Sequence, residues 1–172
     1  TGIALAMLAA ARGYKMIVVM PCNMSEERKC LIRSFGAEIV EVGPSDFAGA
    51  VEKRNALIQE RNGFNPNQFA NVDNRTCHRL TTGQEILRQV AQIPGGPYNI
   101  DAFVTGTGTG GTLMGVRDAL IEKFPEVCVV AVEPAESAVM SGGEAGAHSI
   151  QGIGDGFIPE LVAMDLIHDV IT

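Results

Sequence analysis

A loop of glycines and threonines is the part of the sequence best suited to chemistry. Residues 105–112 read TGTGTGGT, between the apolar run NIDAFV and a helical pattern that extends to Phe124. Glycines let a backbone approach a ligand closely, and a helix N-terminus behind the loop carries partial positive charge. The loop therefore predicts an anion site. A tight turn alone would not require four glycines within six residues, namely Gly106, Gly108, Gly110 and Gly111.

Two kinds of phosphate ligand fit this loop. Gly106, Gly108 and Gly111 satisfy G-x-G-x-x-G, and Glu133 follows Gly111 by 22 residues, where a dinucleotide-binding fold holds a ribose. Four threonines favour a terminal phosphate monoester instead, because its three free oxygens need hydroxyl donors besides amides; they are Thr105, Thr107, Thr109 and Thr112. The loop also follows several expected strands, whereas the dinucleotide motif normally follows the first. It lacks the lysine of a Walker loop.

Alternating strands and helices must position this loop. They predict an α/β fold with a doubly wound, mainly parallel sheet, in which ligands bind beyond the carboxyl ends of the strands. The loop would lie at one such end. Hydrophobic periodicity predicts helices over 1–13, 25–35, 46–62, 77–92 and from the loop to 124, and strands over 14–21, 37–42, 67–72, 99–104, 127–133 and 166–172.

Local signals mark some of the helix ends. Thr1 is expected to cap the first helix through its hydroxyl, and Gly13 is expected to end it. Ser25 is the expected cap of the second helix. The run from Glu26 to Lys29 is expected to be a solvated face of that helix, with acids first and bases later.

Composition excludes several classes of protein. The chain has 172 residues, 46% of them hydrophobic, and a net charge of −7, which suits a globular domain and argues against a nucleic-acid partner. No apolar run is long enough for a membrane helix and no secretory signal pattern begins the chain, so we expect a cytoplasmic protein. The cysteines and histidines show no metal-ligand spacing, and reduced thiols are expected.

Several stretches together resemble one enzyme family. The start TGIALAMLAAARGYKMIVVMP is followed in order by NMSEERKCLIRSFGAEIV, NQFAN, HRLTTGQEI, GTGTGGT, AVEP and QGIGDGFIP. This series is similar to the cysteine synthases (O-acetylserine sulfhydrylases), which are fold-type II pyridoxal-phosphate enzymes; cystathionine β-synthase is a close relative. The resemblance runs from end to end, which makes it more specific than the loop alone.

The resemblance implies roles for individual residues. Gly108, Thr109, Gly110, Gly111 and Thr112 match the loop that holds the phosphate of pyridoxal 5'-phosphate. Gly152 and Gly154 match glycines where the backbone passes close to the cofactor. Thr1 and Gly2 match the end of the loop that binds the substrate carboxylate, and Gln68 matches a glutamine near the substrate. His78 is expected to be a polar residue near the start of its helix and at the rim of the site.

The implied activity is a β-replacement that makes L-cysteine from O-acetylserine and sulfide. The resemblance also implies a homodimer and serine acetyltransferase as a possible partner. None of the four lysines, Lys15, Lys29, Lys53 and Lys123, lies in a motif matching the family's Schiff-base segment. We therefore expect a central fragment, 1–172, of a longer enzyme, inactive by itself and incomplete at both ends of its fold. Within this single α/β region, 25–92 is a possible mobile lobe and 93–172 the part that binds the cofactor phosphate.

Two other functions stay open at this point. One is a non-catalytic relative that keeps the loop but binds a metabolite or a partner protein. The other is an NAD-dependent oxidoreductase, which the G-x-G-x-x-G match would support. An adjacent Cys77 and His78 are not expected to act as nucleophile and base, because neighbours on a helix point about 100° apart.

Overall fold

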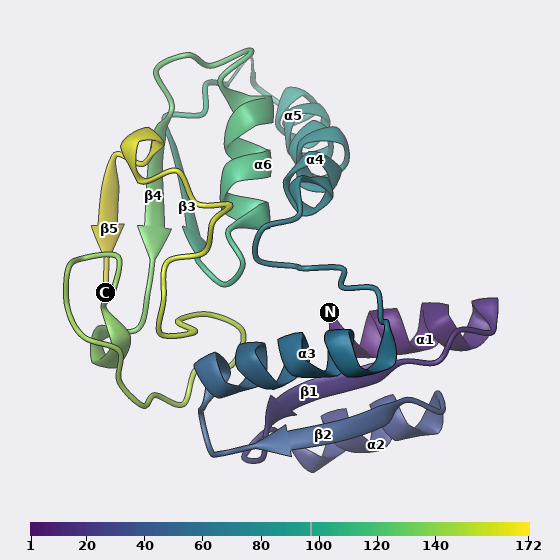
Figure 1. Cartoon of the computed structure of the whole chain (residues 1–172). Coiled ribbons are helices and arrows are strands. Elements are labelled where there is room, and N and C mark those ends of the chain that lie inside the picture. Colours follow the sequence, from purple (N-terminus) through teal and green to yellow (C-terminus); the bar gives the residue numbers. More distant parts are fainter. Residues whose placement is uncertain (97) are drawn as a thin grey trace. The chain divides into compact units, whose positions relative to one another are not determined.

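The chain folds into two compact units. The computed structural model describes residues 1–96 and 98–172, and it divides them into Thr1–Asn65 and Pro66–Thr172 (Figure 1). Each unit has its own parallel sheet and its own hydrophobic core. The expected lobe 25–92 includes parts of both units, so its limits do not coincide with this division. Its mobility stays a prediction.

The first unit is a two-stranded parallel sheet with three helices. Strands β1 and β2 pair in register from Ile17–Glu38 to Pro21–Val42, and helix α2 connects them. Its core contains Ala6, Val18, Met20, Ile32 and Ala37. The elements in order are α1 (Gly2–Arg12), β1 (Ile17–Pro21), α2 (Glu26–Ser34), β2 (Glu38–Val42) and α3 (Phe47–Arg61).

The helix ends of this unit follow the sequence signals with one exception. Gly13 ends α1 in the left-handed conformation, with φ 71°, as expected. Ser25 caps α2, because its hydroxyl accepts a hydrogen bond from the Arg28 amide at 3.4 Å. Thr1 occupies the N-cap position of α1, but its hydroxyl makes no capping hydrogen bond. The prediction for the Thr1 side chain is therefore wrong.

Lys29 also departs from the expectation of a solvated helix face. Lys29 is only 3% exposed. The ammonium donates to the Cys22 carbonyl at 2.7 Å and pairs with Glu26 at 3.1 Å and Glu41 at 3.2 Å. The charge is buried because partners from β2 and the β1–α2 connection surround it, which the order of charges along α2 could not reveal.

The second unit has a three-stranded parallel sheet in the order β3-β4-β5. Its core includes Leu113, Met114 and Val116 of α6 and Val129 and Ala131 of β4. This βαβ arrangement confirms an α/β fold with parallel sheets. The elements in order are α4 (Val72–Leu80), α5 (Thr82–Ala91), β3 (Ala102–Gly106), α6 (Gly111–Leu120), β4 (Cys128–Val132) and β5 (Asp169–Ile171), with 3₁₀ turns at Ala135–Ser137 and Met164–Leu166.

Two sequence predictions in this unit are wrong. The segment NQFANV is a set of turns leading into α4, because Asn67 has φ 47° and the Asn71 side chain accepts from the Asp73 amide. The left-handed conformation of Asn67 is typical of a turn, and the Asn71 cap starts the helix. The expected helix 77–92 is two helices that meet at Thr81, whose φ and ψ are −116° and −80°.

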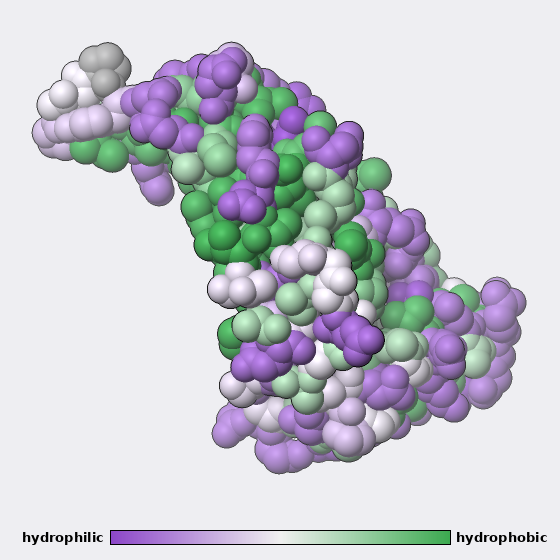
Figure 2. All heavy atoms as spheres, turned by 90° about the vertical axis from the view of Figure 1, so that its left-hand side faces the viewer, coloured by the Kyte–Doolittle hydropathy of each residue, from purple (hydrophilic) through white to green (hydrophobic). Residues whose placement is uncertain are grey.

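Hydrophobic side chains reach the surface of the second unit (Figure 2). Val104 in the middle of β3 is 53% exposed, whereas Val129 and Ala131 of β4 are fully buried. Among residues 1–96 and 98–172, every helix is too short or too polar to span a membrane.

Candidate functional site

The β3–α6 connection forms an uncapped helix start. β3 ends at Gly106 and α6 begins at Gly111. The N-cap residue is Gly110, with φ 82°, and no side chain caps the helix. The first turn also contains no acidic residue. The Gly111 amide donates to Thr109 Oγ1, so the amides that follow it in the first turn, together with the helix dipole, can receive an anion.

The loop packs against the segment that contains the other two expected cofactor glycines. A Cβ atom on Gly108 would overlap the carbonyl oxygen of Gly152, and the Gly154 amide donates to the Thr107 carbonyl at 3.2 Å. Gly152 and Gly154 have φ of 102° and 69°, which other residues adopt rarely. The structure thus brings together glycines that the sequence separates by some 40 residues, and a side chain at Gly108 would block this approach.

The loop threonines have different surroundings. Thr109 Oγ1 receives hydrogen bonds from Asn74 Nδ2 at 2.9 Å and from the Gly111 amide at 3.3 Å. Thr112 Oγ1 lies 3.2 Å from Nε2 of His78. Thr107 is 4% exposed, and its hydroxyl has no partner in the part of the chain that the structure describes.

Helix α4 reaches the loop because glycines let it approach α6 closely. A Cβ on Gly111 would overlap the Asn74 side chain, and one on Gly115 would overlap the Arg75 carbonyl. The next helix, α5, packs on α6 in the same way, because a Cβ on Gly83 would overlap Ala119. Sequence reasoning missed Asn74 and Gly115. Asn71 followed by Asp73 was the available signal, since it is typical of a helix start and would have placed Asn74 in a first turn.

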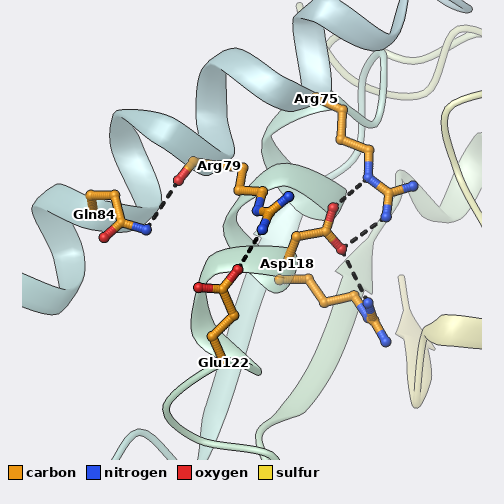
Figure 3. A network of polar contacts seen from close by, with 6 residues as sticks. Arg75, Arg79, Gln84, Asp118 and Glu122 are labelled. Carbon is orange, nitrogen blue, oxygen red and sulfur yellow. Dashed lines mark hydrogen bonds and ion pairs between the residues drawn. The ribbon is translucent and has the colours of Figure 1, made fainter.

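Ion pairs hold α4 on α6 beside this contact (Figure 3). Arg75 forms a two-pronged pair with Asp118 at 2.6 and 2.8 Å, and Arg117 reaches the same carboxylate at 3.1 Å. Hydrogen bonding to Asp118 raises the pKa of the Arg75 guanidinium further above its ordinary range, although burial opposes this. One turn later, Arg79 pairs with Glu122 at 2.6 Å. Residues 75 and 79 therefore face α6, while 74 and 78 face the loop.

His78 lies elsewhere on its helix than expected. It occupies the last turn of α4, where its Nδ1 lies 2.9 Å from Thr82 Oγ1. The ring therefore connects the start of α5 with the loop, and it contacts Thr112 directly. The Cys77 side chain makes a distant contact with Thr81 at 4.0 Å.

The substrate residues implied by the resemblance are distributed over both units. Gln68 belongs to the second unit. Its backbone carbonyl oxygen accepts from Asn74 Nδ2 at 2.9 Å, and the same nitrogen donates to Thr109 Oγ1. Thr1 and Gly2 lie at the N-terminus of α1 in the first unit. Their expected role in binding a carboxylate stays a prediction.

The acid that a dinucleotide would require is engaged elsewhere. Glu133 is 3% exposed. Its carboxylate accepts hydrogen bonds from the Met140 amide at 2.8 Å and from the Ser141 amide and hydroxyl at 2.8 and 2.7 Å. Both oxygens are thus used to hold the connection after β4. This geometry disfavours the dinucleotide interpretation of the loop.

A histidine and an acid lie in the segment around Gly154. Burial raises the pKa of the Asp155 carboxyl, while the charge of His148 opposes this effect. His148 Nε2 lies 2.8 Å from the Gly154 carbonyl, so this nitrogen carries the proton.

An α/β fold with a glycine-rich helix start beyond a strand is typical of proteins that bind phosphorylated ligands. The chain belongs to the pyridoxal-phosphate dependent enzyme family, which it matches over residues 1–172. Cysteine synthase from Staphylococcus aureus is 44% identical in an alignment 172 residues long, which covers 99% of this chain and 54% of that protein. The chain therefore spans about half the length of the curated relatives it matches.

Solved structures agree with this assignment. A hydrogen sulfide-producing enzyme from Fusobacterium nucleatum superposes with a TM-score of 0.90 at 40% identity, over 100% of this chain and 52% of that one. Cysteine synthase from Entamoeba histolytica superposes with a TM-score of 0.86 at 39% identity, over 99% of this chain and 49% of that one. The resemblance to cysteine synthases and the fold class are thereby confirmed.

Proposed function

We propose that the β3–α6 loop binds the phosphate of pyridoxal 5'-phosphate through Gly108, Thr109, Gly110, Gly111 and Thr112. The observation that carries this proposal is the start of α6, where a glycine cap and the absence of acids leave amides and hydroxyls for a dianion. Gly152 and Gly154 would lie beside the cofactor, as glycines that leave it room. The bound cofactor would supply an electron sink for reactions at an amino acid.

The activity we propose for the protein is synthesis of L-cysteine from O-acetylserine and sulfide. The similarity to cysteine synthases supports it. In this proposal Thr1 and Gly2 bind the substrate carboxylate through the N-terminus of α1, and Gln68 lies near the substrate. The start of α1 suits this role because the Thr1 hydroxyl is not used as a cap and the first turn of the helix contains no acid.

No lysine among residues 1–172 is proposed to hold the cofactor covalently. Lys29 is engaged in ion pairs, and Lys123 lies beyond the C-terminal end of α6, about 15 Å along that ten-residue helix from the loop. Borohydride reduction of the full natural polypeptide with its cofactor, followed by peptide mapping, tests this point. A pyridoxyl group on any of the four lysines would contradict it, and its complete absence from the protein would favour the non-catalytic alternative.

Other properties expected from the sequence or implied by the resemblance stay predictions. They are the cytoplasmic location, the homodimer, the association with serine acetyltransferase and the mobile lobe 25–92.

Phosphate binding is tested with the full natural polypeptide by titration with pyridoxal 5'-phosphate, inorganic phosphate and NAD. We expect the first two to compete for one site and Thr109→Val with Thr112→Val to lose affinity for both. Thr76→Val, at an exposed threonine of α4 outside the loop, is the matched control. Tighter binding of NAD than of pyridoxal 5'-phosphate would overturn the proposal.

A further inference from the structure

Helix α4 presents two polar side chains to the two loop hydroxyls. Asn74 and His78 lie four residues apart on one face, and they contact Thr109 and Thr112 respectively. A hydroxyl can donate only one hydrogen, so its value to an anion depends on whether a protein acceptor has already taken that hydrogen. Whether Asn74 and His78 donate to these two hydroxyls or accept from them therefore decides where the hydroxyl hydrogens point.

The hydrogen bonds of Asn74 leave Thr109 as a free donor. Nδ2 faces the Gln68 carbonyl at 2.9 Å, which can only accept, so the amide nitrogen must lie on this side. The same nitrogen donates its second hydrogen to Thr109 Oγ1, and the Gly111 amide donates to that oxygen as well. Both lone pairs of Thr109 Oγ1 are thus used, and its own hydrogen remains for a ligand.

His78 can act in either of two ways on Thr112. If Nε2 carries the proton, it donates to Thr112 Oγ1, the Thr82 hydroxyl donates to Nδ1, and Thr112 keeps its hydrogen for a ligand. If Nδ1 carries the proton, it donates to Thr82, and Thr112 gives its hydrogen to Nε2. Of these two neutral tautomers, only the first lets Thr112 donate to a phosphate.

We propose that Asn74 and His78 are positioning residues that turn the Thr109 and Thr112 hydroxyls into phosphate donors, with phosphate selecting the Nε2–H tautomer of His78. The inference rests on the proposed function of the loop. It adds to that function a hydrogen-bond relay from Gln68 and Thr82 through α4 to the ligand.

Variants of the full natural polypeptide test the relay through the affinity for inorganic phosphate and pyridoxal 5'-phosphate. We expect His78→Phe and Asn74→Leu each to weaken binding about tenfold, as loss of a hydrogen bond to a charged group does. His78→Gln retains an amide donor at the distal position and should restore most of the affinity. Cys77→Ser, on the same helix turn without a contact to the loop, is the matched control.

The tautomer gives a second readout that requires no variant. With ¹⁵N-labelled histidine, two-bond ¹H–¹⁵N correlations should show proton-bearing Nε2 and bare Nδ1 in His78 when inorganic phosphate is bound. The Nδ1–H tautomer in the phosphate complex would overturn the inference, as would unchanged affinity in folded His78→Phe and Asn74→Leu. In both cases the wild-type protein would still bind phosphate; failure of the wild type to bind it would instead contradict the proposed function.

Discussion

Two strand–helix connections of this chain treat the helix N-terminus in opposite ways. At the β1–α2 connection, Ser25 caps the helix with its side chain, and Glu26 and Glu27 occupy the first turn. At the β3–α6 connection, the cap residue is Gly110, which has no side chain, the Thr109 hydroxyl accepts only from the Gly111 amide, and the first turn contains no acid. Both helices connect neighbouring parallel strands. From this comparison we expect the cap residue and the first-turn charge to decide whether the start of such a helix binds an anion.

The largest effect should come from closing the open connection with a single methyl group. Gly108→Ala places a Cβ on the Gly152 carbonyl, so the loop and the facing segment must separate. We expect loss of phosphate binding together with about 2 kcal/mol of stability, as in other overpacked sites. Calorimetry and denaturant unfolding measure both. Gly43→Ala, in the first unit, is the control, since its Cβ would lie 3.6 Å from that of Asp46.

An acid placed in the first turn of α6 should give this helix the first-turn charge of α2 and weaken anion binding. Thr112→Glu puts an acid into the first turn of α6, where it would repel a phosphate dianion. We expect affinity for inorganic phosphate to fall at least about 100-fold, or about 3 kcal/mol. Thr112→Gln, which lacks the charge, should lose about tenfold. Equal losses in the two variants would show that charge does not distinguish the two connections.

Removing the cap of α2 should affect stability without creating a site. Ser25→Ala deletes the acceptor of the Arg28 amide and should cost about 1 kcal/mol in the free energy of unfolding. Ser34→Ala, at the other end of α2, removes an exposed hydroxyl bonded to the Leu31 carbonyl and should cost less. Glu26 and Glu27 remain in the first turn of α2 in this variant and should still repel an anion. Binding of phosphate at the N-terminus of α2 in Ser25→Ala would therefore contradict the comparison.

The smallest effect concerns the acid beside the open connection. Burial raises the pKa of Asp155 above its ordinary value of 3.8, so the folded protein favours the protonated form. The resulting stabilisation is complete below that ordinary value and disappears as pH rises through the folded pKa. Asp155→Asn should therefore gain stability over the wild type near pH 7 and lose this advantage near pH 3. Thermal unfolding across this range, with exposed Glu144→Gln as control, measures it.

Sequence patterns predicted the features that depend on neighbouring residues. The glycine-rich loop, the Ser25 cap and the end of α1 at Gly13 follow from local conformational preferences. The parallel sheets follow from the alternation of strands and helices.

Features that depend on packing between elements could not be predicted in this way. The contact of Asn74 with Thr109 can be predicted only if the face of α4 that meets α6 is known. The burial of Lys29 in α2 depends on Glu41 of strand β2. The segment NQFANV contains apolar residues typical of a strand, but Asn67 and Asn71 take turn and cap conformations. The missing information was tertiary in each case.

The glycine contacts between α4 and α6 have a consequence for motion. Since Gly111 and Gly115 leave no space between the two helices, α6 cannot shift without displacing α4. A loop made more rigid by its ligand should therefore slow amide exchange along α4, whose residues lie at least 25 positions earlier in the chain. The helix pair would then behave as one mechanical body, and occupancy of the loop could be read from the backbone of a helix that never touches the phosphate.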